Sequence, residues 1–155
     1  MTLDPARLSE RIRRDAGRWR NTTIAEQAWR AREERPGRVA LYLEHEPDST
    51  YAAIAEEAQR LIAALRDLGL EQGDVIAFQL PNWREVAAID IAAAALGLVT
   101  TPIVPIYRDA ELEFILRDSA AKLLFVPGQF RSIDYPAMIA RLRDGLPALA
   151  HVVTL

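Results

Sequence analysis

Residues 69–105 read GLEQGDVIAFQLPNWREVAAIDIAAAALGLVTTPIVP, and this stretch decides the fold class that the sequence predicts. Within it, residues 75–80 form a short apolar run that lacks clean polar alternation. Such a strand usually lies inside a parallel sheet that helices cover on both faces. Pro81 ends the strand because proline has no backbone N–H to donate. Residues 100–104 start a second strand, so the stretch is predicted to form a strand–helix–strand unit.

The helix predicted between these two strands has recognisable ends. Asn82 is expected to cap its first turn, and Glu85 stands three residues later, where a capping box places its acidic partner. Gly97 is expected to end the helix, since glycine readily adopts the left-handed conformation of that position. Residues 83–96 carry only three charges, so we expect protein to cover most sides of this helix.

Strands and helices also alternate on both sides of this unit. The predicted helices are residues 24–34, capped within residues 21–23; residues 52–68, capped by Thr50; one capped by Asp109; and one from residues 135–136 to Gly145. The further predicted strands are residues 39–43, 123–126 and 150–155, the first of them in a hairpin-like element. The sequence therefore predicts an α/β fold with a doubly wound, mainly parallel sheet and helices on both faces.

We expect two parts in the chain, an N-terminal helical segment at residues 1–37 and an α/β subdomain at residues 38–155. Residues 5–20 are rich in arginine but lack a continuous apolar stripe, so a solvated surface helix is expected there. In doubly wound sheets, ligands bind beyond the carboxyl ends of the strands. Those ends are predicted to be the loops at residues 81–82, 105–108 and 127–131.

Composition limits the classes of function. The chain has 155 residues and a formal net charge of −3, which gives no general attraction to nucleic acid or to anionic lipid. It has no cysteine, so disulfides, thiolate metal sites and cysteine nucleophiles are excluded. The first residues are polar and do not resemble a secretory signal, and the longest apolar run is too interrupted to span a bilayer. We therefore expect a soluble, cytoplasmic protein without a membrane span or a nucleic-acid partner.

The residues alone do not indicate an active site. Neither the P-loop pattern nor the dinucleotide-binding glycine pattern occurs. Glu111 and Glu113 lie in the first turn of a predicted helix, where acidic side chains stabilise the helix dipole without any metal. We therefore assign no catalytic residue and no metal ligand within the chain.

Several short motifs occur in an informative order and spacing. They are Thr50-Tyr51, Gly69, Gly73-Asp74, Pro81-Asn82, Gly97 to Pro102, Tyr107-Arg108 with Glu111-Leu112, and Asp118-Ser119-Ala120-Ala121-Lys122. Together they resemble the N-terminal part of the adenylate-forming enzymes, which include acyl-CoA synthetases, luciferases and peptide-synthetase adenylation domains. The resemblance covers residues 35–126, and the sequence of residues 102–108 is more similar to that of acyl- or aryl-acid CoA ligases than to that of amino-acid adenylation domains.

Two positions depart from the family's pattern. Ala53 stands where the family often has the glutamate of a capping box, which leaves Thr50 to cap alone. Ala120 stands where the family often has glycine, a change that we expect to be harmless if φ stays negative. The family's phosphate loop, its acidic ATP and magnesium residues and its lysine-bearing C-terminal domain would all follow Leu155. We therefore expect a fragment of a ligase about three times as long, by the usual size of that family.

The resemblance implies an activity for the longer enzyme. It would join a carboxylic acid to AMP with ATP and magnesium, release pyrophosphate, and transfer the acyl group to CoA. By the same resemblance, Tyr107, Arg108 and Arg131 are candidates to contact CoA phosphates, since arginine presents a forked donor. The simpler interpretation of Arg108 is a solvated side chain in front of a capped helix. We expect no cofactor in the fragment itself, and we expect it to catalyse neither step.

Two other functions stay open at this point. One is an adenylation domain that loads a carrier protein, and the other is a stand-alone interaction module of flavodoxin-like type. If a missing remainder of the ligase covers the sheet in the longer protein, the 155 residues would expose strand edge and apolar helix surface, and we expect self-association. The identity of the acid substrate cannot be read from the sequence.

Overall fold

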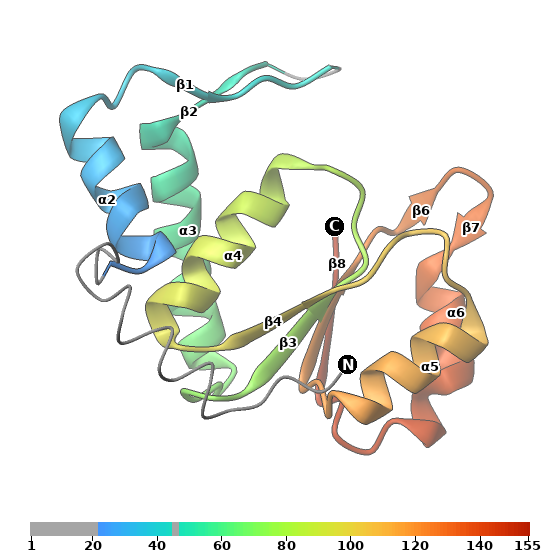
Figure 1. Ribbon diagram of the computed structural model, residues 1–155. Coiled ribbons are helices and arrows are strands. Elements are labelled where there is room, and N and C mark those ends of the chain that lie inside the picture. The colour runs from blue at the N-terminus through green and yellow to red at the C-terminus, as the bar shows by residue number, and fades with distance from the viewer. Residues whose placement is uncertain (1–21, 45–46) are drawn as a thin grey trace, which may run out of the picture.

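The computed structural model describes residues 22–44 and 47–155 (Figure 1). The predicted helix at residues 5–20 lies outside the described residues. The elements in chain order are α2 (Ile24–Glu34), β1 (Val39–Leu41), β2 (Ser49–Thr50), α3 (Tyr51–Asp67), β3 (Val75–Phe78), α4 (Arg84–Leu96), β4 (Val99–Pro102), α5 (Asp109–Asp118), β5 (Leu123–Val126), β6 (Gln129–Phe130), β7 (Ile133–Asp134), α6 (Tyr135–Leu142), a 3₁₀ turn (Arg143–Gly145) and β8 (His151–Thr154).

The main sheet has four strands in the order β4-β3-β5-β8. Every pairing within it is parallel, with Val75 opposite Val99 and Ile76 opposite Leu123. The parallel sheet predicted from the apolar run is therefore confirmed. Because all four strands run the same way, the loops that follow β3, β4 and β5 leave from the same edge of the sheet.

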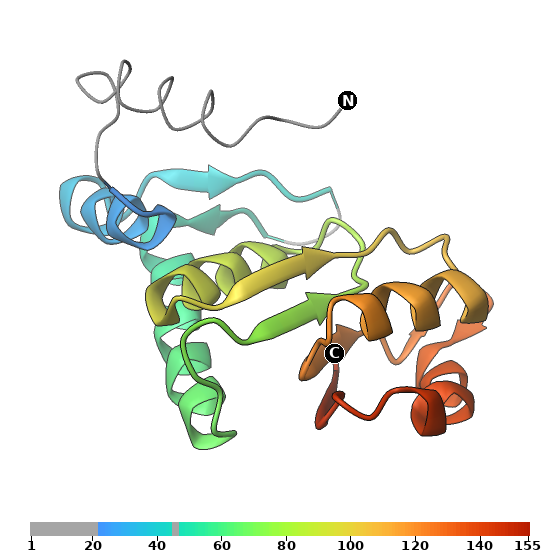
Figure 2. The same cartoon turned by 60° about the horizontal axis from the view of Figure 1, so that its bottom comes forward.

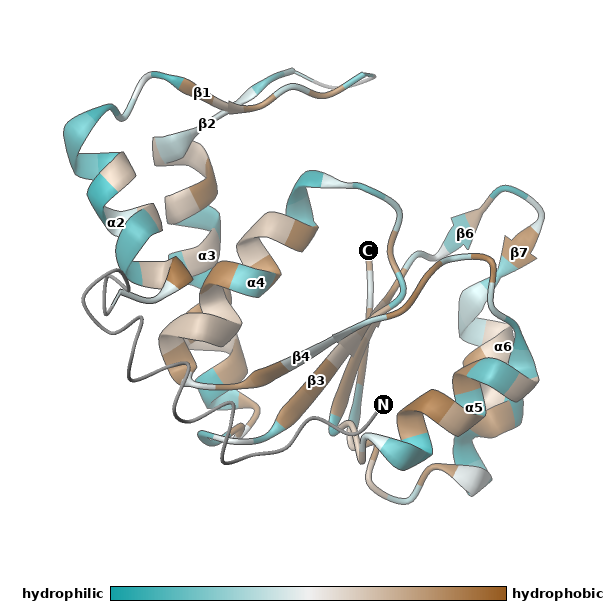
Figure 3. Ribbon diagram, viewed as in Figure 1, coloured by the Kyte–Doolittle hydropathy of each residue, from teal (hydrophilic) through white to brown (hydrophobic). Residues whose placement is uncertain are grey.

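Helices cover both faces of this sheet, as predicted (Figure 2). Ile76 and Phe78 face α3 and α4 in one core cluster, while Ala77 between them faces α5 and α6 in another. Successive residues of a strand point to opposite faces, so a strand buried on both sides has no polar alternation. This explains the uniformly apolar sequence of β3, which is coloured as hydrophobic in Figure 3.

The helix α2 and the short β1–β2 pair lie outside the main sheet. Thr23 caps α2, and Glu26 reaches back to the Thr23 backbone N–H at 2.6 Å, which completes a capping box. Ala25 packs with Ile54 of α3 and Ala88 of α4 in a third buried cluster. The strands β1 and β2 pair antiparallel, which confirms the predicted hairpin-like element. Among the described residues, no helix combines the length and apolar character that a membrane span requires.

Two predicted helix caps are wrong by one residue. The helix α4 begins at Arg84, and its N-cap is Trp83 rather than Asn82. The reason is a tight turn in which the Trp83 N–H donates to the Pro81 carbonyl at 2.7 Å, so the helix starts later. Likewise, Asp109 is the first residue of α5 rather than its cap, and the Arg108 N–H donates to the Glu111 carboxylate at 3.2 Å.

Three helices end on a residue in the left-handed region. These residues are Gly69 with φ +76°, Gly97 with φ +68° and Ala120 with φ +50°. After α5, the Ala121 N–H donates to the Leu116 carbonyl at 3.2 Å, a bond that forms only when the preceding residue turns in this way. The condition under which alanine was expected to be harmless, a negative φ, is therefore not met. A side chain in this conformation costs about 1 kcal/mol.

A small antiparallel hairpin, β6–β7, follows β5 and was not predicted from the sequence. Its strands pair Gln129 with Asp134 and Phe130 with Ile133. Each strand has only two residues, too few for a period of two to be recognised. Its turn also lacks the usual signal, because the residue with positive φ is Arg131 (φ +55°) rather than glycine or asparagine. This hairpin occupies the loop predicted at residues 127–131 and shapes the site described next.

Candidate functional site

A cleft of about 280 Å³ opens at the carboxyl ends of the central strands, and we call it the strand-end cleft. It is lined by Pro81 and Asn82 after β3, by Pro105, Ile106 and Arg108 after β4, and by Phe130, Arg131, Ile133 and Tyr135 from the β6–β7 hairpin and the start of α6. The loops that the sequence predicted to carry a ligand site therefore converge on one cavity. Within residues 22–44 and 47–155, its lining includes two arginines and no carboxylate, histidine or lysine.

Arg108 lies on the rim of this cleft at the start of α5. Its Nη1 donates to the Pro105 carbonyl at 2.8 Å and to the Tyr107 carbonyl at 2.7 Å. The guanidinium group therefore folds back over its own loop, with Nη1 engaged by backbone. The side chain is exposed, so its remaining N–H groups face solvent or a ligand.

Arg131 approaches the cleft from the opposite side, at the turn of the β6–β7 hairpin. Its guanidinium carbon lies 5.4 Å from the centroid of the Phe130 ring, within the range of a cation–π contact. The Phe130 ring in turn meets the Trp83 ring edge-on, with centroids 6.0 Å apart. The Phe130 ring, held edge-on by Trp83, therefore contacts Arg131 without neutralising its charge.

Tyr135 closes the floor of the cleft. It is fully buried, and its hydroxyl donates to the Pro105 carbonyl at 3.1 Å. Burial raises the pKa of the Tyr135 hydroxyl, while the positive charges of Arg108 and Arg131 act in the opposite direction. Among the described residues that line the cleft, two carry a positive charge and none is acidic, so the arrangement favours binding of an anion.

Tyr107, the third candidate, is placed differently. Its side chain is 37% exposed and does not line the cleft. Its carbonyl oxygen, in contrast, accepts hydrogen bonds from Gln79 at 3.0 Å and from Arg108 at 2.7 Å. The structure therefore brings Arg108 and Arg131 together, and it leaves the Tyr107 ring outside.

Gln79 and Tyr135 are the residues near this cleft that the sequence analysis missed. Gln79 is completely buried directly after β3, within the run that the sequence predicts as an apolar strand. A lone amide in a strand that is otherwise apolar on both faces is a usable signal, since a buried polar group needs a partner. The sequence predicts only a helix start at Tyr135, because the proline that follows it suits the first turn of a helix.

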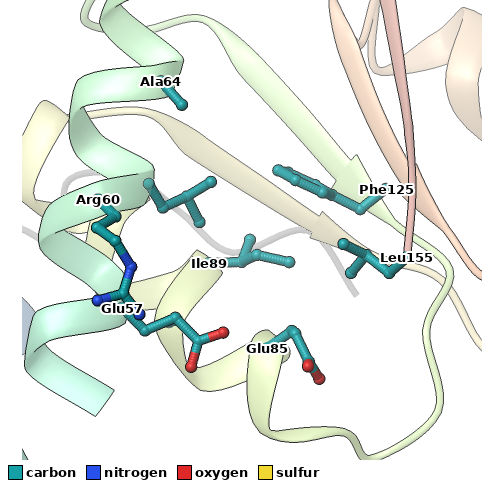
Figure 4. A pocket seen from close by; sticks show the side chains of 9 residues that line it. Glu57, Arg60, Ala64, Glu85, Ile89, Phe125 and Leu155 are labelled. Carbon is teal, nitrogen blue, oxygen red and sulfur yellow. The ribbon is translucent and has the colours of Figure 1, made fainter. Parts of the chain in front are cut away.

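A second cavity, of about 300 Å³, lies between α3, α4 and the end of β5 (Figure 4). Its walls are apolar and comprise Leu61, Ala64, Ala88, Ile89, Phe125 and Leu155. Glu57, Arg60 and Glu85 also line it. No residue that the sequence analysis proposed as a site lies in this cavity.

Comparison with known proteins identifies the family. The sequence profile of the AMP-binding enzymes matches residues 27–155. The chain is 33% identical over 140 residues to the medium-chain fatty-acid–CoA ligase of Escherichia coli (strain K12), a match that covers 90% of this chain and 25% of that protein. It is also 33% identical over 120 residues to the salicyl-AMP ligase / salicyl-S-ArCP synthetase of Mycobacterium tuberculosis (strain ATCC 25618 / H37Rv), covering 77% of this chain and 20% of that protein.

Solved structures agree with this assignment. The apo structure of MbtA from Mycobacterium smegmatis matches with a TM-score of 0.80 and 28% identity, covering 99% of this chain and 28% of that chain. The fatty acyl CoA synthetase of Mycobacterium tuberculosis matches with a TM-score of 0.75 and 26% identity, covering 86% of this chain and 26% of that chain. The chain thus spans about a quarter of the length of these relatives. It belongs to the family of AMP-binding enzymes.

Proposed function

We propose that this chain is the N-terminal part of an ATP-dependent acid–CoA ligase. In the whole enzyme, a carboxylate attacks the α-phosphorus of ATP and releases pyrophosphate, and the CoA thiol then attacks the acyl carbonyl and releases AMP. ATP, magnesium and CoA are the expected partners of the whole enzyme, with a carboxylic acid of unassigned identity. The family match and the likeness to a medium-chain fatty-acid–CoA ligase support this proposal.

Within that enzyme, the strand-end cleft serves as a subsite for the phosphates of CoA. The observation that carries this assignment is the pairing of Arg108 and Arg131 across one cavity, without an acidic residue in its lining. Guanidinium groups bind phosphate oxygens through parallel charge-assisted hydrogen bonds. The starts of α4, α5 and α6 also lie at the cleft, and the positive ends of helix dipoles favour anions. Tyr107 is the weakest of the three candidates, since only its backbone supports the site.

Substitution of the two arginines in the ligase that carries these residues tests the proposal. Arg108→Gln and Arg131→Gln are each expected to raise KM for CoA about tenfold, since a hydrogen bond to a charged group contributes about 1.4 kcal/mol or more. The matched control is Arg66→Gln, which removes the same charge from an exposed site in the last turn of α3. Equal KM values for CoA in all three variants would contradict the assignment of the cleft.

The 155 residues alone are expected to catalyse neither step. The chain contains no glycine-rich phosphate loop, and the strand-end cleft contains no group for acid–base or nucleophilic chemistry. Formation of an acyl-adenylate or a thioester by the purified chain, measured by mass spectrometry, would contradict this expectation.

A carrier-protein ligase is the second candidate, favoured by the likeness to a salicyl-AMP ligase / salicyl-S-ArCP synthetase. Both candidates form an acyl-adenylate, and they differ in the thiol that receives the acyl group. The whole enzyme should therefore be offered free CoA or a carrier protein that bears phosphopantetheine. A CoA thioester supports the first candidate, and transfer to the carrier alone supports the second. Membership of the AMP-binding family disfavours the third possibility, a flavodoxin-like interaction module.

A further inference from the structure

Gln79 is a buried amide that the site described above does not use directly. It follows β3, where the residues alternate between the two faces of the sheet. That alternation places Gln79 on the same face as Ala77, toward α5 and α6. Its exposed fraction is 0%, and its backbone N–H continues the ladder by donating to the Phe125 carbonyl at 2.9 Å. The backbone of Gln79 is therefore fixed by the sheet.

The side chain of Gln79 holds the loop that leaves β4. Its Nε2 donates to the Val104 carbonyl at 3.2 Å and to the Tyr107 carbonyl at 3.0 Å. These two carbonyls lie on either side of Pro105, whose own carbonyl accepts from Tyr135 and Arg108. Three carbonyls of this loop thus accept hydrogen bonds from side chains, and Gln79 donates two of these bonds.

The other end of the amide is unsatisfied. Gln79 Oε1 is buried and has no hydrogen-bond partner among the described residues. A buried acceptor without a partner is unfavourable, and an apolar side chain of the same size would avoid that cost. Such a side chain would, however, remove one donor from each of two carbonyls, leaving Val104 with the Tyr107 N–H alone and Tyr107 with Arg108 alone. The two bonds from Nε2 are therefore the physical role that the amide performs here.

We propose that Gln79 is a positioning residue for Arg108. By fixing residues 104–107 against the rigid end of β3, the amide sets the direction in which the Arg108 guanidinium enters the strand-end cleft. Gln79 does not touch the ligand itself, and its effect passes through the loop. The inference rests on the proposed function in one respect, that the group which Arg108 meets is a CoA phosphate.

The first test concerns the loop and uses the 155-residue chain. Gln79→Met keeps the size of the side chain and removes both donors, and Gln59→Met makes the same change at an exposed position of α3. Amide hydrogen exchange followed by NMR is expected to become about tenfold faster at the Tyr107 N–H in Gln79→Met, while the amides of β3 and β5 keep their protection. Unchanged exchange at Tyr107 would overturn the proposal whatever the enzyme does. Loss of protection throughout the sheet would also overturn it, because Gln79 would then support the core rather than the loop.

The second test concerns function and uses the whole ligase. Gln79→Met is expected to raise KM for CoA about tenfold and to leave acid-dependent ATP–pyrophosphate exchange, assayed without CoA, within about twofold of the unsubstituted enzyme. If Gln79 acts through Arg108, the double variant Gln79→Met/Arg108→Gln should bind CoA no more weakly than Arg108→Gln alone. Additive losses, or a parallel fall in both half-reactions, would overturn the proposal.

The two tests separate failure of this inference from failure of the proposed function. If Arg108→Gln leaves KM for CoA unchanged, the assignment of the cleft to CoA is wrong, and the loop experiment still decides whether Gln79 positions Arg108. If Arg108→Gln raises KM for CoA and Gln79→Met does not, the CoA site stands and the positioning role is refuted.

Discussion

At the scale of single residues, Ala120 carries a backbone strain that the glycines at two other helix ends of this chain avoid. Gly69 and Ala120 both end a helix with positive φ, at +76° and +50°. We predict that Ala120→Gly raises the free energy of unfolding by about 1 kcal/mol and that Gly69→Ala lowers it by a similar amount. A Cβ at Gly69 would meet no atom within 4 Å, so the second change tests the backbone alone. Urea denaturation of both variants measures the effect, and equal stabilities would show that the turn tolerates either residue.

Asp74 is predicted to stabilise the fold in a pH-dependent way. Its carboxylate accepts from the Glu71 N–H at 2.9 Å and lies 2.6 Å from Lys122 Nζ, and these contacts, in that order, lower the pKa of Asp74. A lowered pKa stabilises the folded state above the unfolded value of about 4, and that contribution disappears as the pH falls through the folded value. Asp74→Asn should therefore lower the free energy of unfolding by about 1 kcal/mol at pH 7.

The stability difference between the unsubstituted chain and Asp74→Asn should shrink below pH 4. Lys122→Gln, which removes only the second contact, should have a smaller effect. Thermal unfolding between pH 2.5 and pH 7 measures both variants. A difference that stays constant over that range would show that Asp74 titrates normally.

Residue identity predicted some local features and not others. A cap within residues 21–23 and the cap at Thr50 could be predicted, because a hydroxyl before a helix satisfies an N–H that the helix leaves open. Asn82 matched the same rule and failed it, because the tight turn at Trp83 depends on backbone geometry that no residue type encodes. The positive φ of Ala120 could not be predicted from the residue for a related reason: the Schellman turn after α5 imposes it against the preference of the side chain.

At the scale of elements, α2 and α3 begin with the same threonine cap but differ in its completion. The α2 start has a capping box, with Glu26 reaching back to Thr23, whereas α3 has no acidic residue in its first turn. We predict that Ala53→Glu completes the box at α3 and raises the free energy of unfolding by about 0.5–1 kcal/mol. The position is exposed, so no repacking is required. Ala53→Gln can make the same bond to the Thr50 backbone N–H without the charge, so denaturant midpoints of the two variants separate the capping box from the helix dipole.

Elements buried on both faces were predictable, and the pieces around the site were not. The strands β3 and β5 followed from apolar runs whose burial fixes their conformation. The β6–β7 hairpin was not predicted because each of its strands has two residues and its positive φ falls on Arg131. Arg108 and Arg131 were proposed from a family resemblance and strand-end position. Their shared cavity depends on that hairpin, and only the folded chain shows it.

At the scale of the whole molecule, the described surface exposes apolar groups beside an open sheet edge. Val99 on the edge strand β4 is 50% exposed, and Ile106 and Phe114 are 71% and 68% exposed. Exposed edges and apolar patches favour association between copies. We predict that the 155-residue chain forms dimers or larger species, measured by sedimentation velocity over a wide concentration range.

A matched pair of variants locates the cause of that association. Val99→Lys places a charge on the sheet edge, and Phe114→Lys places one on α5, so whichever surface drives association should yield monomers when it is charged. A monomer at every concentration without any substitution would show that these surfaces do not associate.

The strand order also has a consequence for how the chain folds as it is synthesised. The strand β3 lies between β4 and β5 in the sheet, and both of these neighbours come after it in the sequence. Val75 of β3 therefore cannot pair until Val99 of β4 has been synthesised. At a translation rate of about 5–20 residues per second, this central strand spends roughly 1–5 s without a partner after it leaves the ribosome. The nascent chain therefore passes through a stage in which its central apolar strand is open to chaperones, and slowing translation between these two strands should prolong that stage.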